Sequence, residues 1–163
     1  MVRETARASL HAGVLLVVVG LLAWATGRPF VFPSLGPSGY ALATRSADDI
    51  SPRRVVGGHV IGLGAGLLTY HAVASGLLIT TTAPAFSLSQ LRLVASGVAA
   101  VVLTTAGMLR TDLVHPPACA TTLIVGLGLL SSTVEAGVVV VSVVVLVGVD
   151  AALRPNVRSP AHE

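Results

Sequence analysis

Four long apolar segments constrain the fold of this chain more than any other feature of its sequence. They cover Ala8–Thr26, Val55–Thr80, Leu91–Met108 and Val134–Leu153. At about 1.5 Å of rise per residue, a helix of this length crosses a hydrocarbon core about 30 Å thick. Only 10% of the 163 residues are charged, against about 25% in soluble domains. The sequence therefore predicts an integral membrane protein.

The last long segment contains the valine run VVVVSVVVLVGV. In water, so many β-branched residues favour a strand. In lipid, a lone strand leaves its backbone polar groups without partners, whereas a helix bonds them internally. We therefore predict an all-α fold.

Two shorter apolar segments lie between the long ones, and both contain helix breakers. Arg28–Thr44 contains Pro33, Gly36, Pro37 and Gly39, and Leu113–Leu130 contains Pro116 and Pro117. The order long, broken, long thus occurs twice, once on each side of the polar connection from Thr80 to Gln90. If three segments cross in each half, the second half is upside down relative to the first, as in many transporters.

The predicted fold is a polytopic transmembrane helix bundle of about six segments, arranged as a 3+3 inverted repeat with two Pro/Gly-broken segments. Five spans plus a re-entrant segment is the alternative. We expect a single membrane domain over residues 1–163, with halves at about 8–80 and 91–153.

The ten basic residues, all arginines, support six crossings. Six crossings place eight on one side and only Arg28 and Arg92 on the other, whereas the models with one or two re-entrant segments give seven to three or five to five. Because arginine-rich loops stay in the cytoplasm, we expect both termini there, in a plasma membrane of the prokaryotic type. The arginines form no basic stripe, so we expect no nucleic-acid partner. The eight are Arg3, Arg7, Arg45, Arg53, Arg54, Arg110, Arg154 and Arg158.

The two broken segments predict helix starts inside the membrane. Proline suits the first helical position, so one helix is expected to begin at Pro117 and another at Pro37. The first backbone amides of a helix have no intrahelical partner, and with the helix dipole they favour an anion. The amides expected to be free are those of Ala118, Cys119 and Ala120 in one segment and of Ser38, Gly39 and Tyr40 in the other.

We therefore predict that a small anion binds at these two helix starts near the membrane midplane, with hydroxyl groups and a histidine adding to the site. Kinked spans without a ligand, their freed groups bonded by neighbouring helices, are the alternative. The expected substrate-binding residues are Ser34, Gly36, Ser38, Gly39, His59, His115, Pro116, Pro117, Ala118, Cys119, Thr121 and Thr122.

Three sequence blocks resemble the HPP family of small integral membrane proteins. HPPACATTLIVGLG, from His115, is similar to the family signature, and PRRVVGGHVIG, from Pro52, is similar to its Pro-Arg-Asn-Val-Ile-Gly-Gly-His block. SLGPSG, from Ser34, resembles its Ser-Phe-Gly-Ala-Ser-Ala block. The blocks occur in family order and span most of the predicted membrane domain.

Family members in cyanobacteria and chloroplasts are linked to nitrite transport, so the resemblance implies transport of nitrite or a similar oxyanion. It also strengthens a role for His59. Three residues depart from the family pattern, since Cys119 replaces the usual glycine, Arg54 a frequent asparagine and Pro37 an alanine. Each is a position where anion preference can change.

Other residues have weaker expected roles. His71 lies in a long segment, where polar groups tend to face the bundle interior, and Arg53, Arg54 and Arg110 are candidates for attracting or gating the anion. Gly58, Gly62 and Gly66 form a stripe that allows close helix packing, either within the subunit or against a second copy. We expect a homodimer.

Two other functional classes are less compatible with the sequence. A metal transporter or metal-binding protein would use His59, His71, His115 and Cys119, but these residues lie on separate segments without HxxH or CxxC spacing. A membrane enzyme lacks a recognisable Ser/His/Asp set or carboxylate pair. The nucleotide-binding loop GxxxxGK[ST] requires a lysine, which this chain lacks. We therefore expect no enzyme activity, no cofactor and no metal, and transport driven by a gradient.

Overall fold

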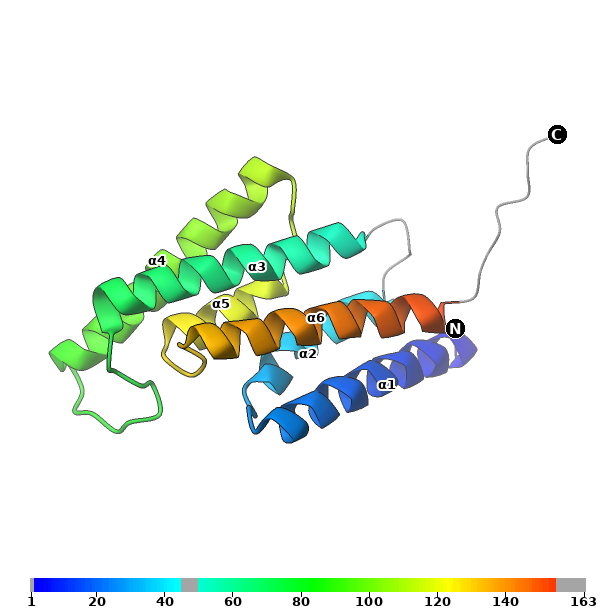
Figure 1. Ribbon diagram of the computed structural model, residues 1–163, viewed down its shortest axis with the longest axis horizontal. Coiled ribbons are helices and arrows are strands. Elements are labelled where there is room, and N and C mark those ends of the chain that lie inside the picture. Colours follow the sequence, from blue (N-terminus) through cyan, green and yellow to red (C-terminus); the bar gives the residue numbers. More distant parts are fainter. Residues whose placement is uncertain (1, 45–49, 155–163) are drawn as a thin grey trace.

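The computed structural model describes residues 2–44 and 50–154, and these residues form helices joined by turns and loops. The predicted all-α polytopic bundle is thereby confirmed. Arg45 and Arg158, which entered the arginine count, lie outside the described residues. The elements are α1 Val2–Thr26, α2 Val31–Thr44, α3 Pro52–Thr69, the π-helical turn η1 Tyr70–Ala74, α4 Leu88–Thr111, α5 Ala118–Gly126 and α6 Thr133–Leu153 (Figure 1).

Four helical stretches are long and apolar enough to cross a membrane. They are Val2–Thr26, Pro52–Ala74, Leu88–Thr111 and Thr133–Leu153, which match the four predicted segments. The second ends earlier than predicted. After η1 the chain leaves the helix and turns at Gly76, whose φ of 79° suits glycine.

The two intervening helices are much shorter. α2 has 14 residues and α5 has 9, which correspond to about 21 Å and 14 Å of helix. Both are shorter than the hydrocarbon core. Extended and turn residues on either side of α5 lengthen that segment, and the chain reverses direction after every helix (Figure 1).

The chain has two related halves, α1–α3 and α4–α6, and each half packs its last helix against the other half. α1 packs against α2 as α4 packs against α5, and α3 packs against α4 and α5 as α6 packs against α1 and α2. α2 meets α5 and α3 meets α6 between the halves. In Figure 1, α4 runs opposite to α1 and α6 runs opposite to α3, as an inverted repeat requires.

Glycines on α3 allow that helix to pack closely against α5 and the segment before it. A Cβ atom added to Gly62 would lie 2.6 Å from Thr122 Oγ1, and one added to Gly66 would lie 2.8 Å from Val125 Cβ. At Gly58 it would lie 2.8 Å from His115 Cβ. The glycine stripe therefore serves a contact within the chain, which settles the alternative left open by the sequence.

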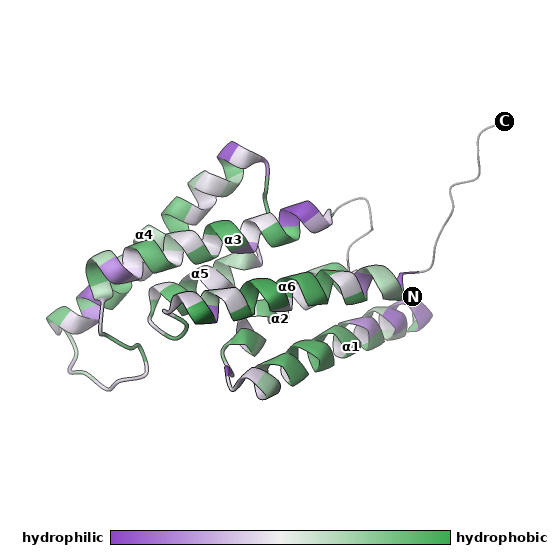
Figure 2. Cartoon of the chain, in the orientation of Figure 1, coloured by the Kyte–Doolittle hydropathy of each residue, from purple (hydrophilic) through white to green (hydrophobic). Residues whose placement is uncertain are grey.

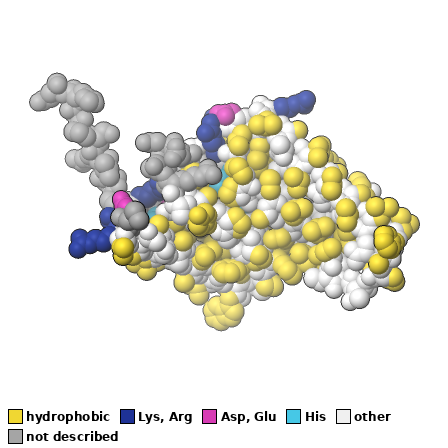
Figure 3. All heavy atoms as spheres, turned by 180° about the vertical axis from the view of Figure 1, so that it is seen from behind, with side chains coloured by type: hydrophobic (Ala, Val, Ile, Leu, Met, Phe, Trp, Pro, Cys, Tyr) yellow, Lys and Arg dark blue, Asp and Glu magenta, His cyan; other side chains and the backbone are white. Residues whose placement is uncertain are grey.

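The surface of the bundle is apolar along the helices and polar at their ends. Figure 2 shows hydrophobic residues through the middle of the long helices and hydrophilic residues at their ends. In Figure 3 the visible charged side chains gather along one edge of a broad apolar face. Large exposed apolar side chains such as Leu21, Val98 and Val144 belong to this lipid-like surface.

Two ion pairs join the halves at equivalent places. Ser51 caps α3 and Ser132 caps α6, each by accepting a hydrogen bond from the backbone N–H three residues later. That later residue is Arg54 in α3, and its Nη2 lies 2.9 Å from Asp112 Oδ2, just after α4. The start of α3 is thereby tied to the residue that follows α4.

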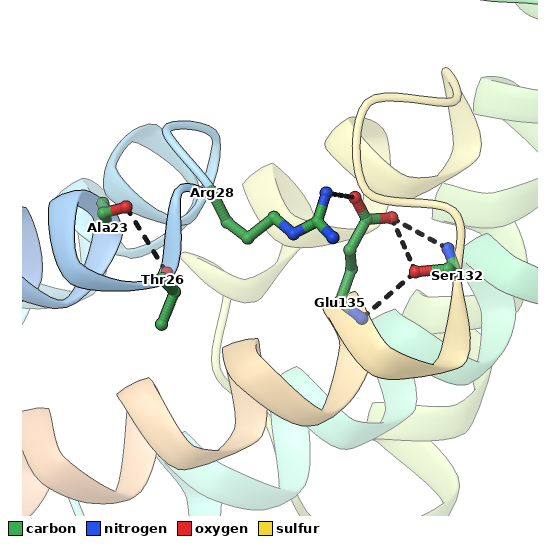
Figure 4. A network of polar contacts seen from close by, with 5 residues as sticks. All are labelled: Ala23, Thr26, Arg28, Ser132 and Glu135. Atoms are coloured by element: carbon green, nitrogen blue, oxygen red, sulfur yellow. Dashed lines mark hydrogen bonds and ion pairs between the residues drawn. The ribbon is translucent and has the colours of Figure 1, made fainter.

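In the other half the charges are exchanged. Glu135 of α6 completes a capping box with Ser132, and its Oε1 lies 2.9 Å from Nη1 of Arg28, just after α1 (Figure 4). Each pair therefore fixes the start of the last helix in one half to the end of the first helix in the other.

The glycine contact gives a matched test. Gly62→Ala places a methyl group against Thr122 Oγ1 and Ala118 O, so we expect a loss of about 1 to 3 kcal/mol in unfolding free energy. Gly64→Ala, whose Cβ meets nothing within 4 Å, should leave stability unchanged or slightly raised. Thermal unfolding in detergent measures both, and equal stability of the two variants would contradict the packing.

The ion pair of Figure 4 can be tested by a double-mutant cycle with Arg28→Gln and Glu135→Gln, since glutamine still supports a capping box. We expect a coupling energy of about 0.5 to 1 kcal/mol, because the arginine is 44% exposed. Arg53→Gln is the control, since Arg53 has no ion pair among the described residues. Absence of coupling would show that the pair does not hold the halves together.

Candidate functional site

The first of the two expected helix starts is placed differently by the structure. α2 begins at Val31 and continues through Pro37, which lies inside it. A turn starts the helix early, with Val31 N–H bonded to Arg28 O and Phe32 N–H to Pro29 O. Pro37 then removes one intrahelical bond, which membrane helices tolerate. The prediction of free amides at residues 38–40 is therefore wrong, because these residues lie within the helix.

The second expected helix start is close to the observed one. α5 begins at Ala118 with Pro117 as its N-cap. The first three amides, however, bond to the carbonyls of residues 115, 116 and 117 at 3.0, 3.0 and 3.1 Å. A tight first turn therefore uses the donors that were expected to face a ligand, and the prediction that amides of two helix starts together hold an anion is wrong.

A cluster of buried side chains occupies the centre instead, and we call it the central cluster. It connects α2, α3 and the segment that leads into α5. Ser38 Oγ lies 2.8 Å from His59 Nε2 and 2.9 Å from His115 Nε2. The centroids of the two imidazole rings are 5.5 Å apart. One hydroxyl group of α2 thus links two histidines from different parts of the chain.

The other nitrogen of His59 continues the network. His59 Nδ1 lies 2.8 Å from Thr121 Oγ1. That hydroxyl lies 3.0 Å from Ser34 Oγ and donates to Ser34 O at 3.3 Å. Hydrogen bonds therefore run without a gap from His115 through Ser38, His59 and Thr121 to Ser34.

A second pair of hydroxyl groups extends the polar region toward α4. Thr122 Oγ1 lies 3.0 Å from Thr104 Oγ1 and donates to Ala118 O at 3.2 Å. Further along the same face of α4, Ser96 donates to Gly126 O at 2.7 Å. The interface of α4 with α5 is therefore held by hydroxyl groups as well as by apolar contacts.

The central cluster is closed to the surroundings. Its side chains and the adjoining threonines are between 0 and 3% exposed. Three hollows of the structure are lined by other residues, near Arg7 and His11, near Thr26, and near Ile50. A ligand of the central cluster must therefore enter by a movement of the surrounding helices.

Local sequence explains how the two histidines come together. His115 precedes Pro116, which keeps it out of the helical region and leaves it in the non-helical stretch between α4 and α5. Gly58 has no side chain, so the backbone of α3 approaches His115 closely. The His-Pro-Pro and Gly-Gly-His sequences are therefore two parts of one contact.

The expected binding residues divide into those inside and those outside the central cluster. Ser34, Ser38, His59, His115 and Thr121 form it, and Thr122 and Ala118 adjoin it.

The remaining expected residues lie away from it. Pro116 is exposed, Pro117 and Cys119 are half-buried, and Gly36 has open space beside it. Gly39 packs toward Leu15 and Leu16 of α1.

The residues proposed for gating lie outside the cluster as well. His71 is exposed and its Nε2 lies 3.0 Å from Ser131 O. Arg53 and Arg110 are exposed at the helix ends near Asp112, where Arg54 forms its ion pair. None of these side chains is within the network, so their expected roles stay predictions.

Sequence reasoning missed two groups. Thr104 was not singled out, although Ser96, Ala100, Thr104 and Met108 are buried at intervals of four on α4, a spacing that marks one helix face. The other group is Asp150, which is 5% exposed and lies 3.0 Å from His11 and 2.9 Å from Arg154.

The described residues do not bring together the ligands that the metal-site alternative requires. Among residues 2–44 and 50–154, no three His, Cys, Asp or Glu side chains are grouped so that they could hold a metal ion. His59 and His115 both direct Nε2 at Ser38, whereas His71 bonds near α6. Of the four residues of that hypothesis, His59 and His115 therefore lie together, but His71 lies elsewhere and no third ligand joins the two among the described residues.

The fold and site together define a small helical membrane protein with a buried polar centre. The model of the HPP transmembrane region matches residues 1–156. The chain therefore belongs to the HPP family, as its three sequence blocks indicated, and it is an integral membrane protein. Comparison with curated proteins gives no match, and comparison with solved structures gives none either.

Proposed function

We propose that this protein is a membrane transporter or channel for a small inorganic anion and that the anion binds at the central cluster. One observation carries the proposal: both halves of the bundle contribute hydroxyl and imidazole groups to a single buried site. α2 supplies Ser34 and Ser38, α3 supplies His59, and the α5 segment supplies His115 and Thr121. In inverted-repeat transporters the substrate site lies at the interface of the repeats.

The chemistry of the central cluster favours an anion over a cation. Hydroxyl groups and imidazole N–H groups donate hydrogen bonds to an anion, and no carboxylate takes part in the network described above. Polar side chains inside a membrane protein commonly mark the path of a substrate or ion. The basic helix ends near Arg53, Arg54 and Arg110 would raise the local anion concentration.

Nitrite is the proposed substrate, or a similar oxyanion, because the family resemblance points to it. Hydrogen-bonding oxygens and a single negative charge suit the cluster, and energy would come from a gradient. We further propose that both termini face the cytoplasm, because Arg3, Arg7 and Arg154 lie at the ends of α1 and α6 that Figure 1 places together.

A homodimer is also part of the proposal, although the glycine stripe is used within the chain. The broad apolar surface of α1 and α4 offers room for a second copy as well as for lipid.

Reconstituted vesicles test the transport function. We expect uptake of nitrite above that of protein-free vesicles, measured beside nitrate, formate, chloride and Zn²⁺ in one series. Zn²⁺ uptake without anion uptake would support the metal alternative, and absence of all fluxes would refute transport.

Variants test the site itself. Thr121→Val and His115→Ala each remove hydrogen-bonding groups of the central cluster, and we expect anion flux to fall about tenfold or more, because a hydrogen bond to a charged group contributes about 1.5 to 3 kcal/mol. Ser142→Ala is the control, since Ser142 is 1% exposed and donates to Val138 O of its own helix. Unchanged flux in both cluster variants, with folding verified in detergent, would move the site elsewhere.

A further inference from the structure

The Ser38 hydroxyl group is shared by two histidines, and this limits where hydrogens can lie. A hydroxyl group has one hydrogen to donate and accepts up to two hydrogen bonds. Ser38 Oγ lies 2.8 Å from His59 Nε2 and 2.9 Å from His115 Nε2. When both imidazoles are neutral, Ser38 donates to one Nε2 and accepts from the N–H of the other.

The hydrogen bonds beyond His59 can be ordered in the same way. Thr121 Oγ1 is near both His59 Nδ1 and the carbonyl oxygen of Ser34. In the order in which His115 donates to Ser38, Ser38 to His59, His59 to Thr121 and Thr121 to the carbonyl oxygen of Ser34, each of the four hydrogen bonds has one hydrogen. The hydroxyl hydrogens of Ser38 and Thr121 are then both bonded within the protein, and the neutral cluster has neither of them left for an anion.

One added proton changes this arrangement. His59 and His115 then both carry a hydrogen on Nε2, and both donate to Ser38 Oγ. The Ser38 hydroxyl hydrogen is released and can be donated to a third acceptor. The cluster also has one positive charge, which is costly in the membrane interior without a partner. A bound anion supplies both the acceptor and the opposite charge.

Three carboxylates of the described residues around the cluster are already bound to other cationic groups. Asp112 pairs with Arg54, Glu135 with Arg28, and Asp150 with Arg154 and His11. Of the other titratable side chains on the helices around the cluster, Tyr70 donates to Leu77 O and Cys119 is half-buried. The rest are exposed: Tyr40, Arg53, His71, Arg92 and Arg110.

From this geometry we propose that each anion crosses together with one proton held by the His59–Ser38–His115 group, so that transport is electroneutral. The inference rests on the proposed anion transport and adds its coupling ion. The proton enters and leaves with the anion, and the imidazoles return to their neutral state after each cycle. A strong-acid anion can be carried in the same way, because the proton is on the protein.

Wild-type protein in vesicles gives the direct test. An inward nitrite gradient is imposed at membrane potentials clamped with potassium and valinomycin, and a trapped pH dye reports protons. We expect one proton to enter per nitrite after the signal of protein-free vesicles is subtracted, at a rate independent of potential. If one net charge moved with each nitrite, a potential of about 100 mV would instead bias the nitrite flux roughly fifty-fold.

The outcomes separate the two proposals. Nitrite flux without proton entry, or flux that follows the potential, overturns coupling and leaves anion transport intact. Absence of nitrite flux above protein-free vesicles overturns the proposed function. Entry of one proton per nitrite, at a rate independent of the membrane potential, supports both anion transport and its coupling to protons.

Variants add a measurement that a purely structural role would not change. His59→Gln and His115→Gln keep hydrogen-bonding groups but cannot titrate. Wild-type flux should fall as pH rises from about 5 to 8, the range over which histidine loses its proton. Flux that remains in either variant should depend less on pH, whereas the control His11→Gln, at a histidine that pairs with Asp150 outside the central cluster, should keep the wild-type profile. A wild-type pH profile in both cluster variants overturns the inference.

Discussion

The close approach of α3 to the α5 segment is the contact on which the rest of the site depends. Glycines at 58, 62 and 66 remove the side chains that would hold the two elements apart. Only at this separation can an imidazole of α3 and one from the segment before α5 share the hydroxyl of Ser38. In a membrane, where hydrophobic burial contributes little to helix association, such close packing and interhelical hydrogen bonds hold the bundle together.

The buried polar centre also accounts for the position of the short helices α2 and α5 at the interface of the two halves. α2 of one half meets α5 of the other, so their hydroxyl groups face one another across the repeat interface. The long helices present apolar side chains outward and small or hydroxyl-bearing residues inward, as on α4. At the two ends, ion pairs of opposite polarity, Arg54 with Asp112 and Glu135 with Arg28, tie one half to the other.

Several parts of the fold could be predicted from the sequence because they depend on local properties of the chain. The length and hydropathy of four segments are local properties, and lipid leaves a helix as the only way to bond their backbones. The order of long and broken segments indicated the repeat. The polar residues that later proved to be clustered, among them His59, His115 and Thr121, could be found because polar groups in apolar segments are rare and tend to face inward.

The way these residues combine was decided by the tertiary structure. The sequence alone suggested free amides at Pro37 and Pro117, but α2 is nucleated earlier by the turn after α1, and the first turn of α5 bonds its own amides. Thr104 joins Thr122 only because α4 packs on α5. Local sequence therefore determined which segments are helical, apolar or interrupted, since those properties depend on residues near in the chain. Which hydroxyl meets which imidazole depended on packing between residues as far apart in the chain as Ser38 and His115, and only the fold brings these two residues together.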